Sequence, residues 1–195
     1  MEELFTHRKK VHHFDEPGHF HELTFSCYNR MPLLNNDSCR LLLTESVDRA
    51  MRRHGYLLIA FVYMPEHVHL LVFPQDGASR IDRLLKAIKR PSSYRIKQLL
   101  TNTRSPLLAK LTILQRPGVT AFRFWQEGPG YDRNLTSLKT ALTAAQYLHR
   151  NPVRRGLVTT EIEWRWSSAI HFLGFCDEPD SGLPVITSLS EIVSP

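Results

Sequence analysis

The sequence predicts an α+β fold in which helices pack on one face of an antiparallel sheet. Three observations support this prediction. The chain has 195 residues, of which 42% are hydrophobic, enough for one domain with a core. Short alternating or continuous apolar runs, typical of strands, recur along it. Segments with helical periodicity separate these runs in the order strand, helix, strand, strand, helix, strand, helix.

The first half of the chain contains the clearest elements. Residues 19–28 alternate and are rich in Phe and Thr, which predicts a strand. Residues 39–54 follow as a helix that Asp37 or Ser38 can cap and Gly55 can end. The apolar runs 56–63 and 67–73 are separated only by Met64, Pro65 and Glu66. They therefore predict two strands joined by a short turn.

The second half begins with basic helices over residues 79–100, which Pro91 should kink or break. Residues 121–126 are predicted to form a strand, followed by a turn at residues 128–130. Residues 135–150 have helical periodicity, and Asn151 before Pro152 should end that helix because a residue before proline disfavours helical geometry.

Positive charge is concentrated in one segment. The chain carries a formal net charge of +6, but residues 79–116 alone contain ten Lys and Arg against the single acid Asp82. A basic helix surface of this kind suits a phosphate backbone, although it can equally be a solvated helix face. The candidate DNA-binding residues are Arg83, Lys86, Lys89, Arg90, Arg95 and Lys97. Residues 177–195 hold four acids and no Lys or Arg.

The sharpest local motif is the run from Met64 to Val72, MPEHVHLLV. On a strand, His67 and His69 point to the same face, so their imidazoles could bind one divalent cation such as Mn²⁺, Zn²⁺ or Fe²⁺. Exposed histidines on a solvent face are the alternative. The sequence has no H-E-x-x-H, P-loop or G-x-G-x-x-G motif, and carboxylates are scarce nearby, which disfavours a two-metal nuclease.

Tyr147 and Asn151 form a second candidate pair. They are four residues apart, so they share one face at the end of their predicted helix. A phenol and an amide placed side by side could act as nucleophile and weak metal ligand. Packing by the tyrosine and helix termination by the asparagine are the structural alternative.

Several other classes of protein are disfavoured. The longest apolar run is far shorter than the roughly 20 residues that cross a bilayer, so no membrane association is expected. The N-terminus lacks the order of a secretory signal, and three cysteines without a C-x-x-C pair predict neither a disulfide framework nor a thiolate zinc site. A cytoplasmic location is expected.

Taken together, the motifs resemble those of the REP-associated tyrosine transposases, which are IS200-like single-strand HUH transposases. The resemblance covers residues 20–174 and keeps the family order of the motifs. They are MPEHVHLLV, FWQ (124–126) with YDR (131–133), YLHRNPVRRGLV (147–158) and WRWSS (164–168).

The resemblance implies a fold, a reaction and a set of site residues. The fold would be an RRM-like or ferredoxin-like antiparallel sheet. His67 and His69 would bind one Mg²⁺ or Mn²⁺, with Asn151 as a third ligand. Tyr147 would be the nucleophile that cleaves and rejoins DNA through a 5′-phosphotyrosine intermediate, and Tyr131 is the alternative nucleophile.

The resemblance also implies a partner and a domain layout. The substrate would be single-stranded or hairpin DNA, handled by a monomer or a homodimer in the cytoplasm at the nucleoid. Residues 1–175 would form the catalytic domain and residues 176–195 an acidic tail that can be flexible. Two other functions stay open: a domesticated DNA- or RNA-hairpin-binding protein without strand transfer, and a metal-dependent phosphodiesterase that uses water.

Overall fold

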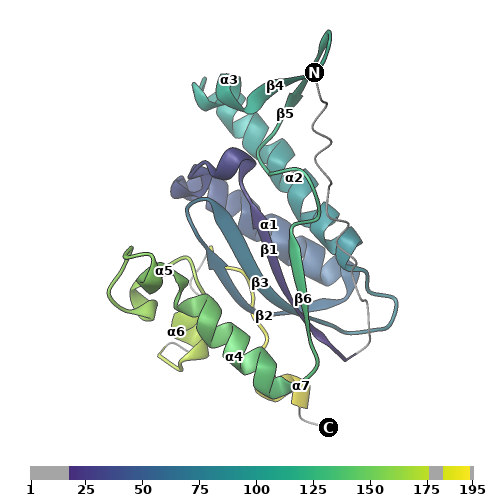
Figure 1. Ribbon diagram of the computed structural model, residues 1–195, viewed down its shortest axis with the longest axis vertical. Helices are drawn as coiled ribbons and strands as arrows, with labels where there is room; N and C mark the ends of the chain where they lie inside the picture. The colour runs from purple at the N-terminus through teal and green to yellow at the C-terminus, as the bar shows by residue number, and fades with distance from the viewer. Residues whose placement is uncertain (1–17, 176–181, 194–195) are drawn as a thin grey trace, which may run out of the picture.

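The computed structural model describes residues 18–175 and 182–193, and its centre is a four-stranded antiparallel sheet (Figure 1). The strands are β1 (Phe20–Ser26), β2 (Tyr56–Tyr63), β3 (His67–Pro74) and β6 (Tyr131–Leu135), in the spatial order β2-β3-β1-β6. The turn Met64 to Glu66 joins β2 to β3 as the sequence predicts. The α+β class and the antiparallel sheet are confirmed.

The register of β3 decides which side chains share a face. His69 lies opposite Thr24 of β1 and Val62 of β2, and His67 lies opposite Ser26. Val68, Leu70 and Val72 alternate with the histidines and enter the main hydrophobic core. The two histidines therefore project from the face opposite to that core.

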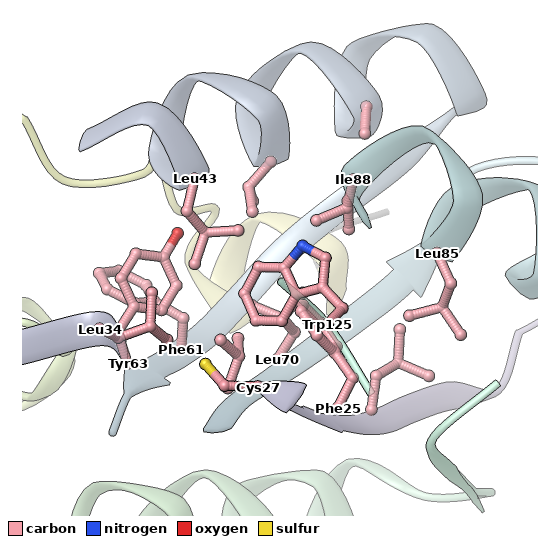
Figure 2. Close-up of a cluster of buried hydrophobic side chains, with 14 of the residues drawn as sticks. Phe25, Cys27, Leu34, Leu43, Phe61, Tyr63, Leu70, Leu85, Ile88 and Trp125 are labelled. Atoms are coloured by element: carbon pink, nitrogen blue, oxygen red, sulfur yellow. The ribbon is translucent and has the colours of Figure 1, made fainter. Parts of the chain in front are cut away.

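Two helices cover the core face of the sheet. Helices α1 (Asp37–His54) and α2 (Ile81–Asn102) pack there, and Figure 2 shows Leu43 of α1 and Leu85 and Ile88 of α2 around Trp125. The Asn36 side chain accepts from the Cys39 amide at the start of α1, and Gly55 ends that helix at φ 66°. The packing of α1 and α2 confirms that helices cover this face of the sheet.

A third helix crosses the opposite face. Helix α4 (Leu138–His149) begins with a capping box at Ser137 and packs its alanines against a second apolar cluster with Ala60, Val62 and Leu71. Helix α5 (Asn151–Arg154) follows directly. The sheet is thus sandwiched between α1 and α2 on one side and α4 on the other.

Short elements surround this framework. Near β1 are the 3₁₀ turns η1 (Tyr28–Arg30) and η2 (Leu33–Asn35). After α2 come α3 (Leu107–Leu111) and the separate hairpin of β4 (Thr112–Arg116) and β5 (Val119–Phe122). The C-terminal part adds η3 (Glu161–Glu163), α6 (Ala169–Phe172) and α7 (Leu189–Val193).

C-terminal segments cover the outer edge of β2. The Tyr63 amide donates to the Trp166 carbonyl at 2.8 Å, and the Ser168 amide donates to the Phe61 carbonyl at 3.0 Å. Further along, the Thr187 amide donates to the Leu58 carbonyl at 2.7 Å. Part of the predicted acidic tail is therefore packed against the sheet, while residues 176–181 and 194–195 of that tail lie outside the described residues.

Two details of the sequence prediction were wrong. The fourth strand of the main sheet is Tyr131–Leu135, not 121–126, because the latter run divides between β5 and a connecting segment. The predicted basic helices are one helix, because α2 continues through Pro91 without a break. There the Ser92 hydroxyl donates to the Ile88 carbonyl at 2.7 Å, which supplies a local hydrogen bond beside the missing proline donor.

No helix within residues 18–175 and 182–193 combines the length and the hydropathy that crossing a membrane requires.

Candidate active site

The imidazoles of His67 and His69 meet on the α4 face of the sheet. Their Nε2 atoms are 2.9 Å apart, and their ring centroids are 4.7 Å apart with the ring planes at 78°. Side chains two residues apart on a strand share a face, and here the rings also converge on one point. The pair is therefore arranged so that both Nε2 atoms can face a single ion.

The second nitrogen of each ring is held by a neighbouring side chain. His67 Nδ1 lies 3.0 Å from the Glu66 carboxylate, which can only accept, so this nitrogen carries the proton and Nε2 presents a lone pair. His69 Nδ1 lies 2.9 Å from the Thr24 hydroxyl, which can accept or donate. Carboxylate and hydroxyl partners of this kind orient metal-binding histidines, and the carboxylate also sets the tautomer of His67.

Burial keeps both imidazoles neutral. Desolvation, with a smaller contribution from the neighbouring His67, lowers the pKa of His69 to about 3. Desolvation also lowers the pKa of His67, although the Glu66 carboxylate opposes the shift. A neutral imidazole is the form that binds a divalent cation. The two imidazoles therefore fit one divalent cation that keeps open coordination positions.

Glu66 connects the histidines to the end of α5. Arg155 Nη1 lies 2.7 Å from Glu66 Oε1, and Arg30 Nη2 lies 3.4 Å from the same oxygen. Burial would raise the pKa of Glu66, but the hydrogen bond and charge of Arg155, together with the hydrogen bond from His67, hold it below its usual value. The carboxylate therefore stays ionised and fixes both His67 and the residues after α4.

Tyr147 lies in the last turn of α4 and is 51% exposed. The guanidinium carbon of Arg154 lies 4.6 Å from the centroid of its ring, a cation–π contact. The phenol is therefore accessible. The ion pair between Arg155 and Glu66 links the end of the adjoining helix α5 to His67.

The Asn151 side chain caps the helix in this structure. Its Nδ2 donates to the carbonyls of Tyr147 at 3.3 Å and Leu148 at 3.1 Å, which are among the last carbonyls of α4. The amide nitrogen is thereby occupied, while the side-chain oxygen is the atom that could bind a metal. Among residues 18–175 and 182–193, no group of three or more His, Cys, Asp or Glu side chains forms a metal cluster.

Tyr131 lies at the start of β6 on the same face as the histidines. It is opposite Thr24, which is in turn opposite His69, so the three residues form one row across β6, β1 and β3. The Tyr131 side chain is 56% exposed. Gly130 precedes it at φ 83°, and a Cβ atom there would lie 2.3 Å from the Thr24 carbonyl oxygen, so this position requires glycine.

The basic residues predicted to bind DNA lie on α2, on the other side of the sheet. Three of them have protein partners: Lys86 pairs with Asp82, Arg95 pairs with Glu45, and Lys89 donates to the carbonyls of Gln126 and Gly128. The other three are exposed and have no acidic partner within the described part of the chain: Arg83, Arg90 and Lys97. The structure therefore does not bring the α2 cations together with His67 and His69.

A groove of about 650 Å³ lies between α2 and residues 122–129. Its apolar wall includes Phe122 and Trp125, and its cations include Arg90, Lys97 and Arg123. Trp125 is fixed by a 3.0 Å hydrogen bond from its Nε1 to the Ser92 hydroxyl. The α2 surface thus offers cations around an aromatic groove.

Comparison with known proteins identifies the family. The family model of IS200-like transposases matches residues 18–117, just over half of the chain. The chain belongs to the IS200-like transposase family. The matched region of this IS200-like transposase includes His67 and His69 and ends before Tyr147 and Asn151.

One solved structure shows the same fold, and a second is less similar. A REP-associated tyrosine transposase bound to a REP hairpin has a TM-score of 0.67 at 16% identity, covering 93% of this chain and all of that one. A putative transposase from Deinococcus radiodurans R1 has a TM-score of 0.42 at 21% identity, covering 73% of this chain and 97% of that one. No protein of curated function matches the sequence.

Sequence reasoning missed four residues of this transposase site. Glu66 could have been found, because it directly precedes His67 in a chain segment that is poor in acids. Thr24, Arg30 and Arg155 gave no such signal. Thr24 reaches His69 through strand pairing, and Arg30 and Arg155 reach Glu66 through the placement of their segments rather than through nearness in sequence.

Proposed function

We propose that this IS200-like transposase cleaves and rejoins single-stranded DNA beside a hairpin through a 5′-phosphotyrosine intermediate on Tyr147. The observation that carries the proposal is the convergence of the His67 and His69 Nε2 atoms at 2.9 Å, with each Nδ1 atom held by a second side chain. A pure binding module has no need of such a preorganised nitrogen pair.

His67 and His69 would hold one Mg²⁺ or Mn²⁺, and the Asn151 side-chain oxygen is proposed as a third ligand. When bound, the ion supplies Lewis acid chemistry, drawing charge from the non-bridging oxygens of the scissile phosphate. Glu66 and Thr24 keep the rings in place, which lowers the ordering cost of the site. Arg155 and Arg30 place positive charge beside it.

Tyr147 would supply the nucleophilic oxygen. Its Oη forms a bond to phosphorus as the bond from phosphorus to the 3′-oxygen breaks, so the phenol loses a proton and the leaving strand gains a 3′-hydroxyl. The phosphotyrosine conserves the phosphodiester bond energy, so a second 3′-hydroxyl can reverse the step and join a new strand without ATP. Arg154, which packs on the ring, puts a cation near the phosphate.

The α2 surface is proposed to bind the hairpin stem. Arg83, Arg90 and Lys97 are exposed there, and such cations contact phosphates without reading sequence. The similar solved structure contains a REP hairpin, which makes hairpin DNA the substrate class to test first. Lys86, Lys89 and Arg95 are the weaker candidates because each already has a protein partner.

A covalent-adduct assay tests the reaction. The protein is incubated with labelled hairpin DNA that carries a single-stranded flank, with Mn²⁺ or Mg²⁺, and the products are separated on a denaturing gel. We expect a protein–DNA adduct in the wild type, none above background in Tyr147→Phe, and an adduct in Tyr131→Phe. The phenylalanine variants change only the hydroxyl, so they are matched controls for each other.

Results other than these would indicate a different nucleophile or a different function. An adduct that persists in Tyr147→Phe and vanishes in Tyr131→Phe would move the nucleophile to Tyr131. Cleavage without any adduct would indicate a phosphodiesterase that uses water. Hairpin binding without cleavage under either metal would indicate a domesticated DNA- or RNA-hairpin-binding protein.

A further inference from the structure

Helix α4 leaves one corner of its sheet face open. The helix starts beside Leu135 at one end of β6, and its far end, at Leu148, joins the same apolar cluster as Val62 and Met64 at the end of β2. It therefore crosses the face diagonally. The uncovered corner contains the row Tyr131, Thr24, His69, which runs from β6 to β3.

The Tyr131 ring stands on this corner without a stacking partner. Side chains directly opposite each other in an antiparallel sheet point to the same face, so Tyr131 and His69 flank Thr24. Two strand spacings of about 4.8 Å put the Tyr131 and His69 backbones about 10 Å apart. Within the described part of the chain no ring or cation stacks on Tyr131, whereas Arg154 already covers the Tyr147 ring.

A cation lies beside the exposed ring. Arg133 is two residues further along β6 and thus on the same face, and its side chain is half exposed. Its Nη1 lies 3.5 Å from Glu22 Oε2, a buried carboxylate on β1. One carboxylate can use only part of the five-donor guanidinium, so Arg133 keeps donors that Glu22 does not use.

We propose that Tyr131 and Arg133 form a binding subsite for one unpaired nucleotide, with its base stacked on the Tyr131 ring and its phosphate bound by Arg133. The inference rests on the proposed function, since it takes single-stranded DNA as the ligand of this face. An aromatic ring on a sheet surface beside a cation is the arrangement by which sheets bind unpaired bases. The subsite would position the strand relative to His69.

The subsite gives Tyr131 a role that does not use its hydroxyl. A base stacks on phenylalanine much as it stacks on tyrosine, so Tyr131→Phe should retain binding and Tyr131→Ala should lose it. A nucleophile would behave differently, because Tyr131→Phe would then abolish the adduct. The two substitutions therefore separate stacking from nucleophilic attack.

The test measures binding without cleavage. A short single-stranded oligonucleotide with 2-aminopurine at successive positions is titrated with protein in EDTA. We expect Tyr131→Ala to weaken binding by about tenfold or more and to remove the fluorescence quenching at one position, while Tyr131→Phe keeps both. Phe175→Ala is the control, because the Phe175 ring is 68% exposed after α6 and belongs to neither proposed DNA-binding surface, so this variant should bind as the wild type does.

The salt dependence tests the phosphate contact. Arg133→Gln should reduce the log–log slope of affinity against salt by about 0.7, the contribution of one phosphate on a single strand. Circular dichroism and the unfolding midpoint of each variant establish that the sheet is intact. A slope equal to that of the wild type would overturn the role of Arg133.

Other outcomes overturn the stacking site. The stacking site is overturned if Tyr131→Ala binds as the wild type does, or if Tyr131→Phe and Tyr131→Ala lose the same affinity. It is also overturned if the wild type does not bind single strands. The proposed cleavage can fail separately: binding with Tyr131-dependent quenching but no adduct in Mn²⁺ would leave the subsite standing. If Tyr131→Ala formed an adduct and bound DNA as the wild type does, the proposed cleavage would stand and the subsite would be overturned.

Discussion

The two histidines of the site are held by unlike partners. His67 donates to the ionised Glu66, whereas His69 contacts the neutral Thr24 hydroxyl. Strand alternation alone predicts that His67 and His69 share a face, and the structure confirms it. The partner of His69 was not predictable, because Thr24 lies 45 residues away and meets His69 only through the register of β1 on β3.

Thr24→Val should weaken Mn²⁺ binding by about 10- to 100-fold. Valine keeps the shape of the side chain but removes the hydroxyl that orients His69, and loss of such an orienting partner typically costs this much affinity. Isothermal titration with Mn²⁺ measures the change. The control is Thr101→Val on α2, whose hydroxyl bonds only to the Lys97 carbonyl of its own helix. Equal Mn²⁺ affinity in Thr24→Val and Thr101→Val would contradict an orienting role.

Strand β6 is the element that the local sequence pattern could not predict. Residues 131–135 contain Asp132, Arg133 and Asn134, so the segment has no strand-like run of apolar residues. It nevertheless pairs with β1, because Gly130 allows the chain to approach the Thr24 carbonyl closely. By contrast, the apolar runs of β2 and β3 identify those strands directly.

Gly130→Ala should destabilise the protein by about 1–3 kcal/mol. The added Cβ would lie 2.3 Å from the Thr24 carbonyl oxygen, so β6 would have to move away from β1. Urea unfolding measures the free energy of unfolding. Gly128→Ala is the matched control: it also has positive φ, at 106°, but its Cβ would meet nothing within 4 Å. Equal losses in the two variants would mean that backbone strain, and not the close approach, sets the cost.

Across the whole molecule, the sheet separates the two surfaces that are proposed to contact DNA. The exposed cations of α2 lie on one side, and the histidines with Tyr147 and Tyr131 lie on the other. Charge counting along the sequence located the first surface, and motif spacing located the second. Their placement on opposite sides could not be predicted, because the same residue order is compatible with α4 on either face. A DNA that contacts both surfaces must therefore pass around the sheet.

Burial of neutral histidines makes the stability of the whole molecule depend on pH. His149 Nε2 lies 2.8 Å from the Ser168 hydroxyl between α4 and the covered edge of β2, and burial lowers the pKa of His149 to about 4. The unfolded chain therefore binds a proton below about pH 6.5 that the folded chain excludes until about pH 4. The free energy of unfolding is therefore highest above about pH 6.5 and decreases as the pH falls from there to about 4.

Between pH 7 and pH 5 the wild type should lose about 2 kcal/mol of its free energy of unfolding through His149, and His149→Gln should not show this loss. Glutamine can still hydrogen-bond to Ser168 but cannot be protonated. Urea unfolding at both pH values gives the difference for the wild type and for the variant. His171→Gln, at a half-buried histidine of α6, serves as the comparison. The linkage would be wrong if wild type and His149→Gln lost the same stability on acidification.

The covered edge of β2 also has a consequence for how the chain folds. Its hydrogen-bond partners Trp166, Ser168 and Thr187 come from more than 100 residues further along the chain, whereas β2 and β3 are joined by a short turn. Closing a long loop costs chain entropy that a local hairpin does not incur. We therefore expect the β2–β3 hairpin, which carries both histidines, to form before its outer edge is closed. Until then an unpaired strand edge is exposed to other chains, so refolding yield should fall as protein concentration rises.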